Sequence, residues 1–313
     1  MLDELKVFTG NTHPGLAKGV CAYLGIPLGE AEVFQFSNEN TFVRILENVR
    51  GRDVFVIQPV SSPVNQSLME LLIFLDTLKR ASADRITAVV PYYGYGRSDK
   101  KDQPRVPITG RLVADLLTVA GANRVLTVDL HAGQIQGFFN IPVDELTALY
   151  IMRNYFKEKK WDNLTVVATD IGISKRARDL AHMLNATLAI IEKRRVGNND
   201  KTETLNIIGD VRGRRALMVD DEIDTAGSLV AAVTALEKNG ATEVYSCCTH
   251  PIFSGPAVKR IAASTVKEVI VTDTVPVTKE KKLDKIIVLS TASLIGEAIA
   301  CIHTGQSVGA LFK

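Results

Sequence analysis

The sequence predicts an α/β fold in which mostly parallel sheets are flanked by helices, and three observations support this. Short apolar, β-rich runs alternate with amphipathic helical windows along almost the whole chain, the pattern of parallel strands joined by helices. Leucines recur at helical spacing through Asn65–Ala81, which indicates a helix with one face in the core. Apolar residues make up 46% of 313 residues, enough for a large buried core.

The elements follow from these patterns in chain order. Nine short apolar runs are expected as strands: Lys6–Thr9, Asp53–Gln58, Arg85–Val90, Val125–Asp129, Leu164–Ala168, Leu188–Ile191, Ala216–Val219, Val244–Thr249 and Val269–Thr272. Four windows with apolar residues at helical spacing are expected as core-facing helices: Asn65–Ala81, Arg111–Ala120, Lys175–Leu184 and Leu229–Asn239.

A short internal repeat suggests two similar halves. Gly121–Val125 reads GANRV and Gly240–Val244 reads GATEV, and each would end a helix and open a strand. The length also fits two domains. We therefore expect an N-terminal domain of residues 1–147 and a C-terminal domain of residues 148–313, whose last helix could pack back on the first domain.

Composition excludes several classes of protein. The chain has 37 basic and 35 acidic side chains, a net charge of +2, which gives no general field for nucleic acid or a membrane, so neither is expected as a partner. Disorder, collagen and coiled coil do not fit the composition. The four cysteines show no CxxC spacing and are expected to be reduced and structural. The chain shows neither a targeting pattern nor an apolar window of about 18 residues, so we expect a cytoplasmic protein.

The strongest local motif is Ala216–Ser228, ALMVDDEIDTAGS, an apolar run followed by acidic and then small residues. It predicts a strand, a turn and a helix N-terminus. Backbone N–H groups from Thr225 to Ser228 would bind a phosphate at the positive end of the helix dipole. Asp220 and Asp221 could accept hydrogen bonds from sugar hydroxyls. An isolated aspartate pair more often caps a turn, but the thirteen-residue context favours the ligand site.

This motif resembles the ribose 5-phosphate signature of phosphoribosyl enzymes. Together with other segments, in order along the chain, it is similar to the ribose-phosphate diphosphokinase family, also called phosphoribosyl pyrophosphate synthetase. Those segments are ENVRGRDVFVIQ (Glu47–Gln58), PYYGYGRSDKK (Pro91–Lys101), VDLHAGQIQGFF (Val128–Phe139), IIEKRR (Ile190–Arg195) and CCTHPIFSGPA (Cys247–Ala257). The resemblance implies two phosphoribosyltransferase-like domains. It also implies transfer of the diphosphoryl group of MgATP to the 1-hydroxyl of ribose 5-phosphate, with AMP released.

The resemblance also implies roles for site residues. Lys193 and Arg195 would be the catalytic cations, on a loop after the strand Leu188–Ile191, where a solvated basic run is the plainer alternative. His131 and Asp170, each just after a predicted strand, would hold Mg²⁺. In-line displacement at phosphorus needs positive charge and positioning more than a covalent nucleophile. Seven residues would bind ribose 5-phosphate: Asp220, Asp221, Asp224, Thr225, Ala226, Gly227 and Ser228.

The expected ATP-binding residues are Phe36, Asn38, Asn40, Arg97 and Asp99. Arg97 and Asp99 match the family's usual Arg-Gln-Asp-Arg segment, whereas Ser98 does not. Asn38 and Asn40 stand where the family has carboxylates near adenine. Ile173 likewise stands where the family commonly has a glycine. The chain contains no P-loop and no GxGxxG fingerprint.

A second departure from the family concerns regulation. Members activated by phosphate and inhibited by ADP often have Arg-Ser where this chain has Asp102–Pro104, and a serine where it has Gly309. Because arginine is the strongest oxyanion donor, we expect no phosphate requirement. The resemblance implies a homo-oligomer, a hexamer or a smaller even assembly. A catalytically weak regulatory paralogue and a phosphoribosyltransferase remain as alternatives.

Overall fold

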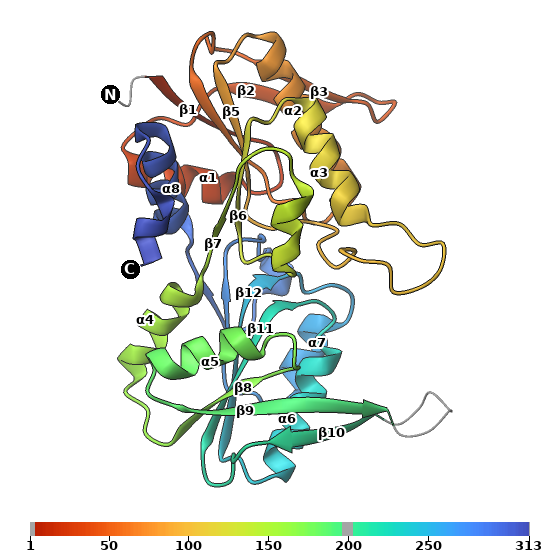
Figure 1. Ribbon diagram of the computed structural model, residues 1–313, viewed down its shortest axis with the longest axis vertical. Coiled ribbons are helices and arrows are strands. Elements are labelled where there is room, and N and C mark those ends of the chain that lie inside the picture. Colours follow the sequence, from red (N-terminus) through yellow and green to blue (C-terminus); the bar gives the residue numbers. More distant parts are fainter. Residues whose placement is uncertain (1–3, 196–202, 313) are drawn as a thin grey trace. The chain divides into compact units, whose positions relative to one another are not determined.

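The computed structural model describes residues 4–195 and 203–312. The chain divides into two compact units (Figure 1). Unit 1 comprises Met1–Thr147, Thr274–Pro276 and Ser290–Lys313, and unit 2 comprises Ala148–Asp273 and Val277–Leu289. Each unit contains a mostly parallel sheet with helices, so the predicted α/β fold class is confirmed.

Unit 1 is built on a five-stranded parallel sheet in the order β1-β4-β5-β6-β7. Its strands are β1 (Leu5–Thr9), β4 (Asp53–Ile57), β5 (Arg85–Val90), β6 (Arg124–Val128) and β7 (Val143–Leu146). The helices are α1 (Pro14–Leu24), α2 (Val64–Arg80), α3 (Thr109–Ala120) and α8 (Ala292–Thr304), with 3₁₀ segments η2 (Gly133–Phe138) and η4 (Val308–Phe312). A separate antiparallel hairpin joins β2 (Ala31–Gln35) and β3 (Thr41–Ile45).

The leucine pattern of α2 places one face of the helix in the core, as predicted. Leu71, Leu75 and Leu78 are fully buried and pack with Phe74 in the core of unit 1. The helix α3 ends before Gly121, whose φ of 128° suits a residue without a side chain, and β6 starts three residues later. The first copy of the internal repeat therefore joins a helix to a strand, as predicted.

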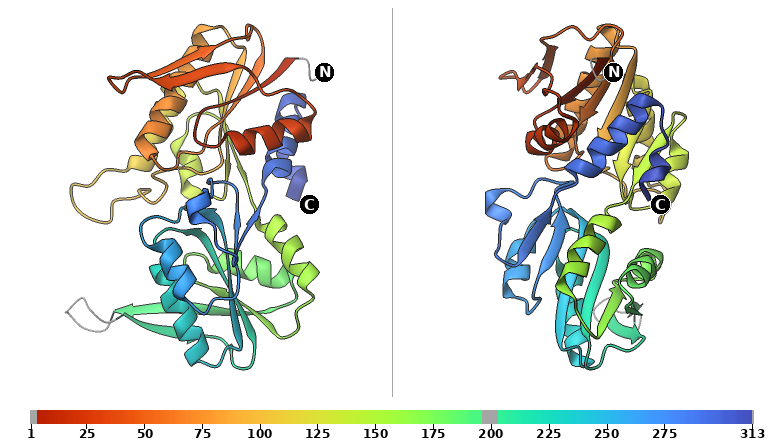
Figure 2. Two further views of the ribbon diagram at one scale, coloured as in Figure 1. Left: turned by 180° about the vertical axis from the view of Figure 1, so that it is seen from behind. Right: turned by 90° about the vertical axis from the view of Figure 1, so that its left-hand side faces the viewer.

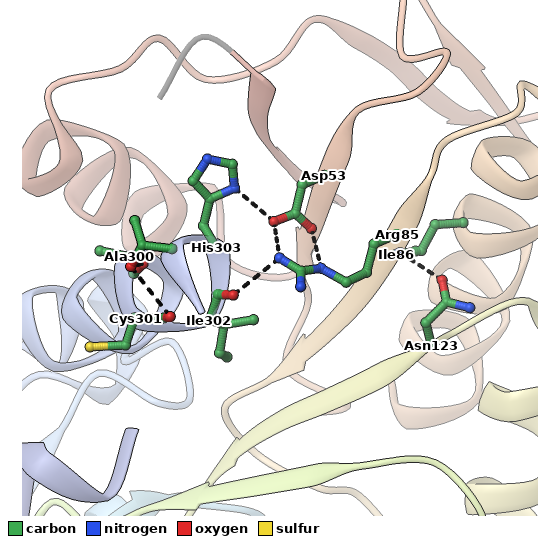
Figure 3. Close-up of polar contacts among 9 residues, drawn as sticks. Asp53, Arg85, Ile86, Asn123, Ala300, Cys301, Ile302 and His303 are labelled. Atoms are coloured by element: carbon green, nitrogen blue, oxygen red, sulfur yellow. Dashed lines mark hydrogen bonds and ion pairs between the residues drawn. The ribbon is translucent and has the colours of Figure 1, made fainter. Parts of the chain in front are cut away.

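The helix α8 is held to the sheet of unit 1 by a polar network (Figure 3). Buried Asp53, at the start of β4, accepts a hydrogen bond from Arg85 Nε at 2.8 Å and lies 2.7 Å from Nδ1 of His303. Arg85 also donates to the carbonyl of Ile302 at 3.1 Å. Residues more than 200 positions apart in the sequence thus form one connected cluster.

Unit 2 has a seven-stranded sheet in the order β10-β9-β8-β11-β12-β13-β14. All neighbours are parallel except β9 and β10. Its strands are β8 (Leu164–Ala168), β9 (Thr187–Arg195), β10 (Glu203–Ile208), β11 (Arg215–Ile223), β12 (Glu243–Pro251), β13 (Val269–Thr272) and β14 (Ile286–Leu289). The helices are α4 (Leu149–Lys159), α5 (Ser174–Met183), α6 (Gly227–Lys238) and α7 (Ala257–Ala263), with the 3₁₀ segment η3 (Lys279–Lys281).

Helices lie on both faces of this sheet (Figure 2), and each face has its own hydrophobic core. Ala216 and Met218 of β11 pack with α6 and α7, whereas Leu217 and Val219 pack with α4 and α5. Successive residues of a strand point to opposite faces, so helices lie on both sides and β11 is buried among them. β11 is therefore packed on both faces over Ala216–Val219, directly before its acidic end.

Two predicted strands run four residues further at their carboxyl ends. β9 continues from the predicted Leu188–Ile191 to Arg195, because it pairs with β10 in a hairpin. β11 continues from the predicted Ala216–Val219 to Ile223, because it stays paired with β12 as far as Pro251. The acidic residues that were expected in a turn therefore lie in the last part of a strand.

Two further expectations concern cysteines and membranes. All four cysteines, Cys21, Cys247, Cys248 and Cys301, are buried free thiols, as predicted. Burial raises the pKa of Cys247 to about 12, so this thiol is unreactive at neutral pH. In residues 4–195 and 203–312, no helix has both the length and the hydropathy needed to cross a membrane.

Candidate active site

The acidic end of β11 lies beside the end of β8 in unit 2. Thr169, the residue after β8, donates from Oγ1 to Asp220 Oδ2 at 2.7 Å. The backbone N–H of Asp221 donates to Asp220 Oδ1 at 2.9 Å. Carboxyl ends of neighbouring parallel strands are where α/β proteins bind ligands. The Asp220 side chain is thus fixed at a typical ligand position, next to Asp221.

The two carboxyl groups are close enough to affect each other's charge. Burial and the neighbouring Asp221 raise the pKa of Asp220 to about 8 from its ordinary value of 3.8. Asp220 therefore holds a proton at neutral pH, and a protonated carboxyl can donate one hydrogen bond and accept others. Such a group suits a sugar hydroxyl, which is itself both a donor and an acceptor.

The chain then turns into α6 through Asp224, Thr225 and Ala226. Ala226 adopts the left-handed conformation, with φ 59° and ψ 14°, and the first turn of α6 has no side-chain cap. The hydroxyl of Ser254 donates a hydrogen bond to Asp224 Oδ1. Because the N–H groups of an uncapped helix start have no partner within the helix, the segment from Thr225 to Ser228 offers donors to an anion.

A second helix start lies after β8. Asp170 Oδ1 accepts the N–H of Ile173 at 3.1 Å, and α5 begins at Ser174. Ile171 in the same loop is 63% exposed. Asp170 and the start of α5 belong to the same edge of the sheet as Asp220, since β8 and β11 are neighbours in parallel register.

The predicted catalytic cations lie in a strand rather than in a loop, which corrects the expectation. The backbones of Lys193 and Arg195 pair with Leu205 and Glu203 across the β9–β10 hairpin. The segment Val196–Asp200, expected as their continuation, lies outside the described residues.

The ATP-binding residues expected near the N-terminus lie at the tip of the β2–β3 hairpin in unit 1. The aromatic ring of Phe36 lies 5.1 Å from that of Phe34 and 5.7 Å from that of Phe42. Asn38 Oδ1 accepts the backbone N–H of Asn40 at 3.2 Å. Phe36 is 49% exposed, so this tip offers an exposed aromatic ring beside amide groups.

The other expected ATP-binding residues follow β5. Arg97, Lys100 and Asp102 contribute to the lining of a cavity of about 240 Å³. Asp99 is buried and accepts a hydrogen bond from Gln134. A Cβ added to Gly96 would lie 3.6 Å from the Cβ of His131, so the segment before Arg97 runs directly past His131.

The predicted metal residues fall in different units: His131 in unit 1 and Asp170 in unit 2. Within the described residues of the chain, no group of three or more His, Cys, Asp or Glu side chains forms a metal centre. Asp170 lies on an exposed loop, and its carboxylate is the donor type that Mg²⁺ prefers.

Four residues that contact the site residues escaped the sequence prediction: Thr169, Gln134, Ser254 and Arg260. Thr169 follows the end of a predicted strand, which is a signal that could have identified it. Gln134, Ser254 and Arg260 are far in sequence from Asp99, Asp224 and Thr225, which they contact. No spacing rule connects such pairs.

Comparison with known proteins identifies the family. The N-terminal domain of ribose phosphate pyrophosphokinase matches residues 5–121, and the phosphoribosyl synthetase-associated domain matches residues 195–313. The ribose-phosphate pyrophosphokinase of Caldanaerobacter subterraneus is 55% identical over 311 residues, which cover 99% of this chain and 98% of the relative. The chain belongs to the ribose-phosphate pyrophosphokinase family.

Two further relatives agree with this result. The ribose-phosphate pyrophosphokinase of Fusobacterium nucleatum is 51% identical over 313 residues and 99% of both chains. The crystal structure of phosphoribosylpyrophosphate synthetase from Mycobacterium smegmatis matches with a TM-score of 0.92 at 42% identity, covering 97% of this chain and 100% of that one. The family resemblance and the enzyme class predicted from the sequence are confirmed: the protein is a ribose-phosphate diphosphokinase that makes phosphoribosyl diphosphate for nucleotide biosynthesis.

Proposed function

We propose that the enzyme transfers the β,γ-diphosphoryl group of MgATP to the 1-hydroxyl of ribose 5-phosphate without requiring inorganic phosphate as an activator. The 1-oxygen forms a bond to the β-phosphorus, and the bond from that phosphorus to the α,β-bridging oxygen breaks. AMP leaves with that oxygen, and the proton of the 1-hydroxyl is released. The products are 5-phosphoribosyl 1-diphosphate and AMP.

The observation that carries the sugar-phosphate assignment is the sequence of features at the end of β11. Two carboxyl groups, Asp220 and Asp221, come first, and an uncapped helix start follows at Gly227. The carboxyl groups would accept and donate hydrogen bonds to the ribose hydroxyls. The N–H groups of Ala226, Gly227 and Ser228 would bind the 5-phosphate, with Asp224 and Thr225 at the rim.

The cations required by the reaction are assigned to Lys193 and Arg195. Their positive charge would stabilise the transferring diphosphoryl group, which is where negative charge develops. Mg²⁺, when bound, neutralises charge on the oxygens of the triphosphate. His131 and Asp170 are assigned to binding Mg²⁺ ions, and the exposed carboxylate of Asp170 fits the preference of Mg²⁺ for oxygen donors.

ATP is assigned to residues of unit 1. The exposed ring of Phe36 would stack on adenine, with the amides of Asn38 and Asn40 as hydrogen-bonding partners. The guanidinium of Arg97, on the wall of the cavity, would bind phosphate oxygens. Asp99 would act indirectly, because its carboxylate fixes Gln134.

The absence of a phosphate requirement is supported by the chemistry of two segments. Asp102–Pro104 stands where phosphate-activated members often have Arg-Ser, so a carboxylate replaces the strongest oxyanion donor expected in that segment. Gly309 in η4 offers no hydroxyl. A ligand that does not bind active and inactive states differently cannot shift their balance, so phosphate would not switch this enzyme on, and ADP would inhibit by competing with ATP.

A cytoplasmic homo-oligomer, a hexamer or a smaller even assembly, completes the proposal. Leu112, Leu116 and Val119 lie on one face of α3, and Val119 is 75% exposed. The ion pair between Arg111 and Asp115 lies on the same helix. A two-fold contact with a second copy would cover the apolar face and bring each arginine near the other copy's aspartate.

One assay tests the proposed reaction. Purified protein with Mg²⁺ and ATP is given ribose 5-phosphate in a phosphate-free buffer, and nucleotides are separated by chromatography. We expect AMP and phosphoribosyl diphosphate in equal amounts, with less than a twofold gain on adding millimolar phosphate. ADP as the product would contradict the reaction. Activity that appears only with phosphate would contradict the proposed independence from phosphate but not the proposed reaction.

A further inference from the structure

The alanine at the start of α6 is in a conformation that L-residues avoid. Ala226 has φ 59° and ψ 14° and is 5% exposed. The left-handed region brings Cβ too close to the following carbonyl oxygen. Such a conformation persists only where the surroundings hold it, and it occurs at ligand sites in particular. What holds Ala226 therefore bears on how the phosphate site is formed.

Arg260 on α7 contacts the peptide bond that precedes Ala226. Its Nη1 atom donates to the carbonyl oxygen of Thr225 at 3.0 Å. The same nitrogen lies 3.3 Å from the place that a Cβ at Gly227 would take. The guanidinium thus fixes the direction of the Thr225 carbonyl and, through the planar peptide, of the Ala226 N–H.

Two backbone contacts hold the preceding residues of the same loop. The N–H of Phe253 donates to the carbonyl of Ile223, and the N–H of Ser254 donates to the carbonyl of Asp224, each at 3.0 Å. These contacts stop before Thr225. Among the described residues, the next hydrogen bond along the loop is the one from Arg260 to the carbonyl of Thr225. It lies at the peptide bond that leads into the left-handed residue Ala226.

The placement of a cation here has an electrostatic cost. A positive charge at a helix N-terminus is disfavoured by the helix dipole, so the hydrogen bond from Arg260 to the Thr225 carbonyl has to offset that cost. The exposed Lys259 is the neighbour of Arg260 on α7. It provides a charge-matched comparison, because it carries the same charge on the same helix.

We propose that Arg260 is a positioning residue for ribose 5-phosphate: it holds the Thr225–Ala226 peptide in the left-handed conformation that aims the N–H groups of the loop at the 5-phosphate. This inference rests on the proposed assignment of the sugar phosphate to the same loop. Arg260 acts through the Thr225 carbonyl. Its contribution to ribose 5-phosphate affinity therefore depends on the free-energy cost of a positive φ at residue 226.

The test is a double-mutant cycle with calorimetry of ribose 5-phosphate binding to the full-length protein. Arg260→Ala is expected to raise Kd about fivefold to thirtyfold, the factor that corresponds to the ~1–2 kcal/mol by which L-residues disfavour this region. Glycine has no such penalty. Ala226→Gly in the Arg260→Ala background should therefore recover most of the lost affinity. Lys259→Ala is expected to leave Kd unchanged.

Two results would overturn the proposal. One is an Arg260→Ala protein that binds ribose 5-phosphate as the wild type does. The other is an Arg260→Ala/Ala226→Gly protein that binds as weakly as Arg260→Ala alone, because the arginine would then act on the phosphate directly. MgATP affinity should stay within twofold in all variants, which confirms folding. A wild-type protein that does not bind ribose 5-phosphate would contradict the proposed function itself.

Discussion

Replacing Asp220 by asparagine should stabilise the folded protein at neutral and alkaline pH. Asp220 has a pKa of about 8 in the folded state and an ordinary value of 3.8. Between these values the unfolded chain releases the proton and the folded protein keeps it. Stability therefore falls as pH rises from about 4 to about 8, by ~1.4 kcal/mol per pH unit. The penalty is on the order of 4 kcal/mol at pH 7 and 1–2 kcal/mol at pH 5.

Asparagine reproduces the protonated carboxyl: its carbonyl oxygen accepts the Asp221 N–H, and its NH₂ group can donate to Thr169 Oγ1, which then donates to the carbonyl of Val219. Thermal unfolding followed by circular dichroism at pH 5, 7 and 8.5 measures the effect. We expect Asp220→Asn to raise Tm by several degrees at pH 7 and 8.5 and by much less at pH 5. Asp170→Asn, an exposed aspartate at the same sheet edge, serves as the control. An equal change in Tm at all three pH values, or a Tm below that of the wild type at pH 8.5, would refute the reasoning.

Three further substitutions follow from the proposed site and the fold. Lys193→Ala should lower kcat by roughly 100-fold or more, as for the loss of one electrostatic stabiliser, with little change in KM for ribose 5-phosphate; an unchanged kcat in steady-state assays would remove Lys193 from the mechanism. Asp221→Ala should weaken ribose 5-phosphate binding about tenfold to 100-fold, since a charged hydrogen bond is worth ~1.5–3 kcal/mol, whereas calorimetry showing weakened MgATP binding instead would reassign this strand end. His303→Ala removes a partner of buried Asp53 and should destabilise unit 1 by ~1–3 kcal/mol, and an unchanged Tm would mean that Arg85 alone satisfies the carboxylate.

The sequence predicted the central strands, and it predicts a candidate site at the ends of two of them, because both depend on local patterns. Asp220 and Asp170 follow apolar runs, and the ends of parallel strands meet at one edge of a sheet. The sequence did not predict where β9 and β11 end. Pairing with β10 and β12 extends both strands through charged residues, and local propensity carries no information about such partners.

The contacts that hold the site were also beyond sequence reasoning. Arg260 contacts Thr225 from 35 positions away, and His303 lies 250 positions from Asp53. These pairs depend on how helices pack on the sheets and on a C-terminal helix that joins unit 1. The family resemblance supplied the chemistry of the motif residues but not these supporting side chains.

The measurement that tests the central claim most directly follows the fate of each ATP phosphate. ATP labelled with ³²P at the β-position is incubated with Mg²⁺, ribose 5-phosphate and the purified protein, and a second sample carries the label at the γ-position. The account predicts that both labels appear in phosphoribosyl diphosphate in equal amounts and that AMP is unlabelled, because the diphosphoryl group moves intact. Transfer of the γ-label alone, with the β-label left in ADP, would contradict it.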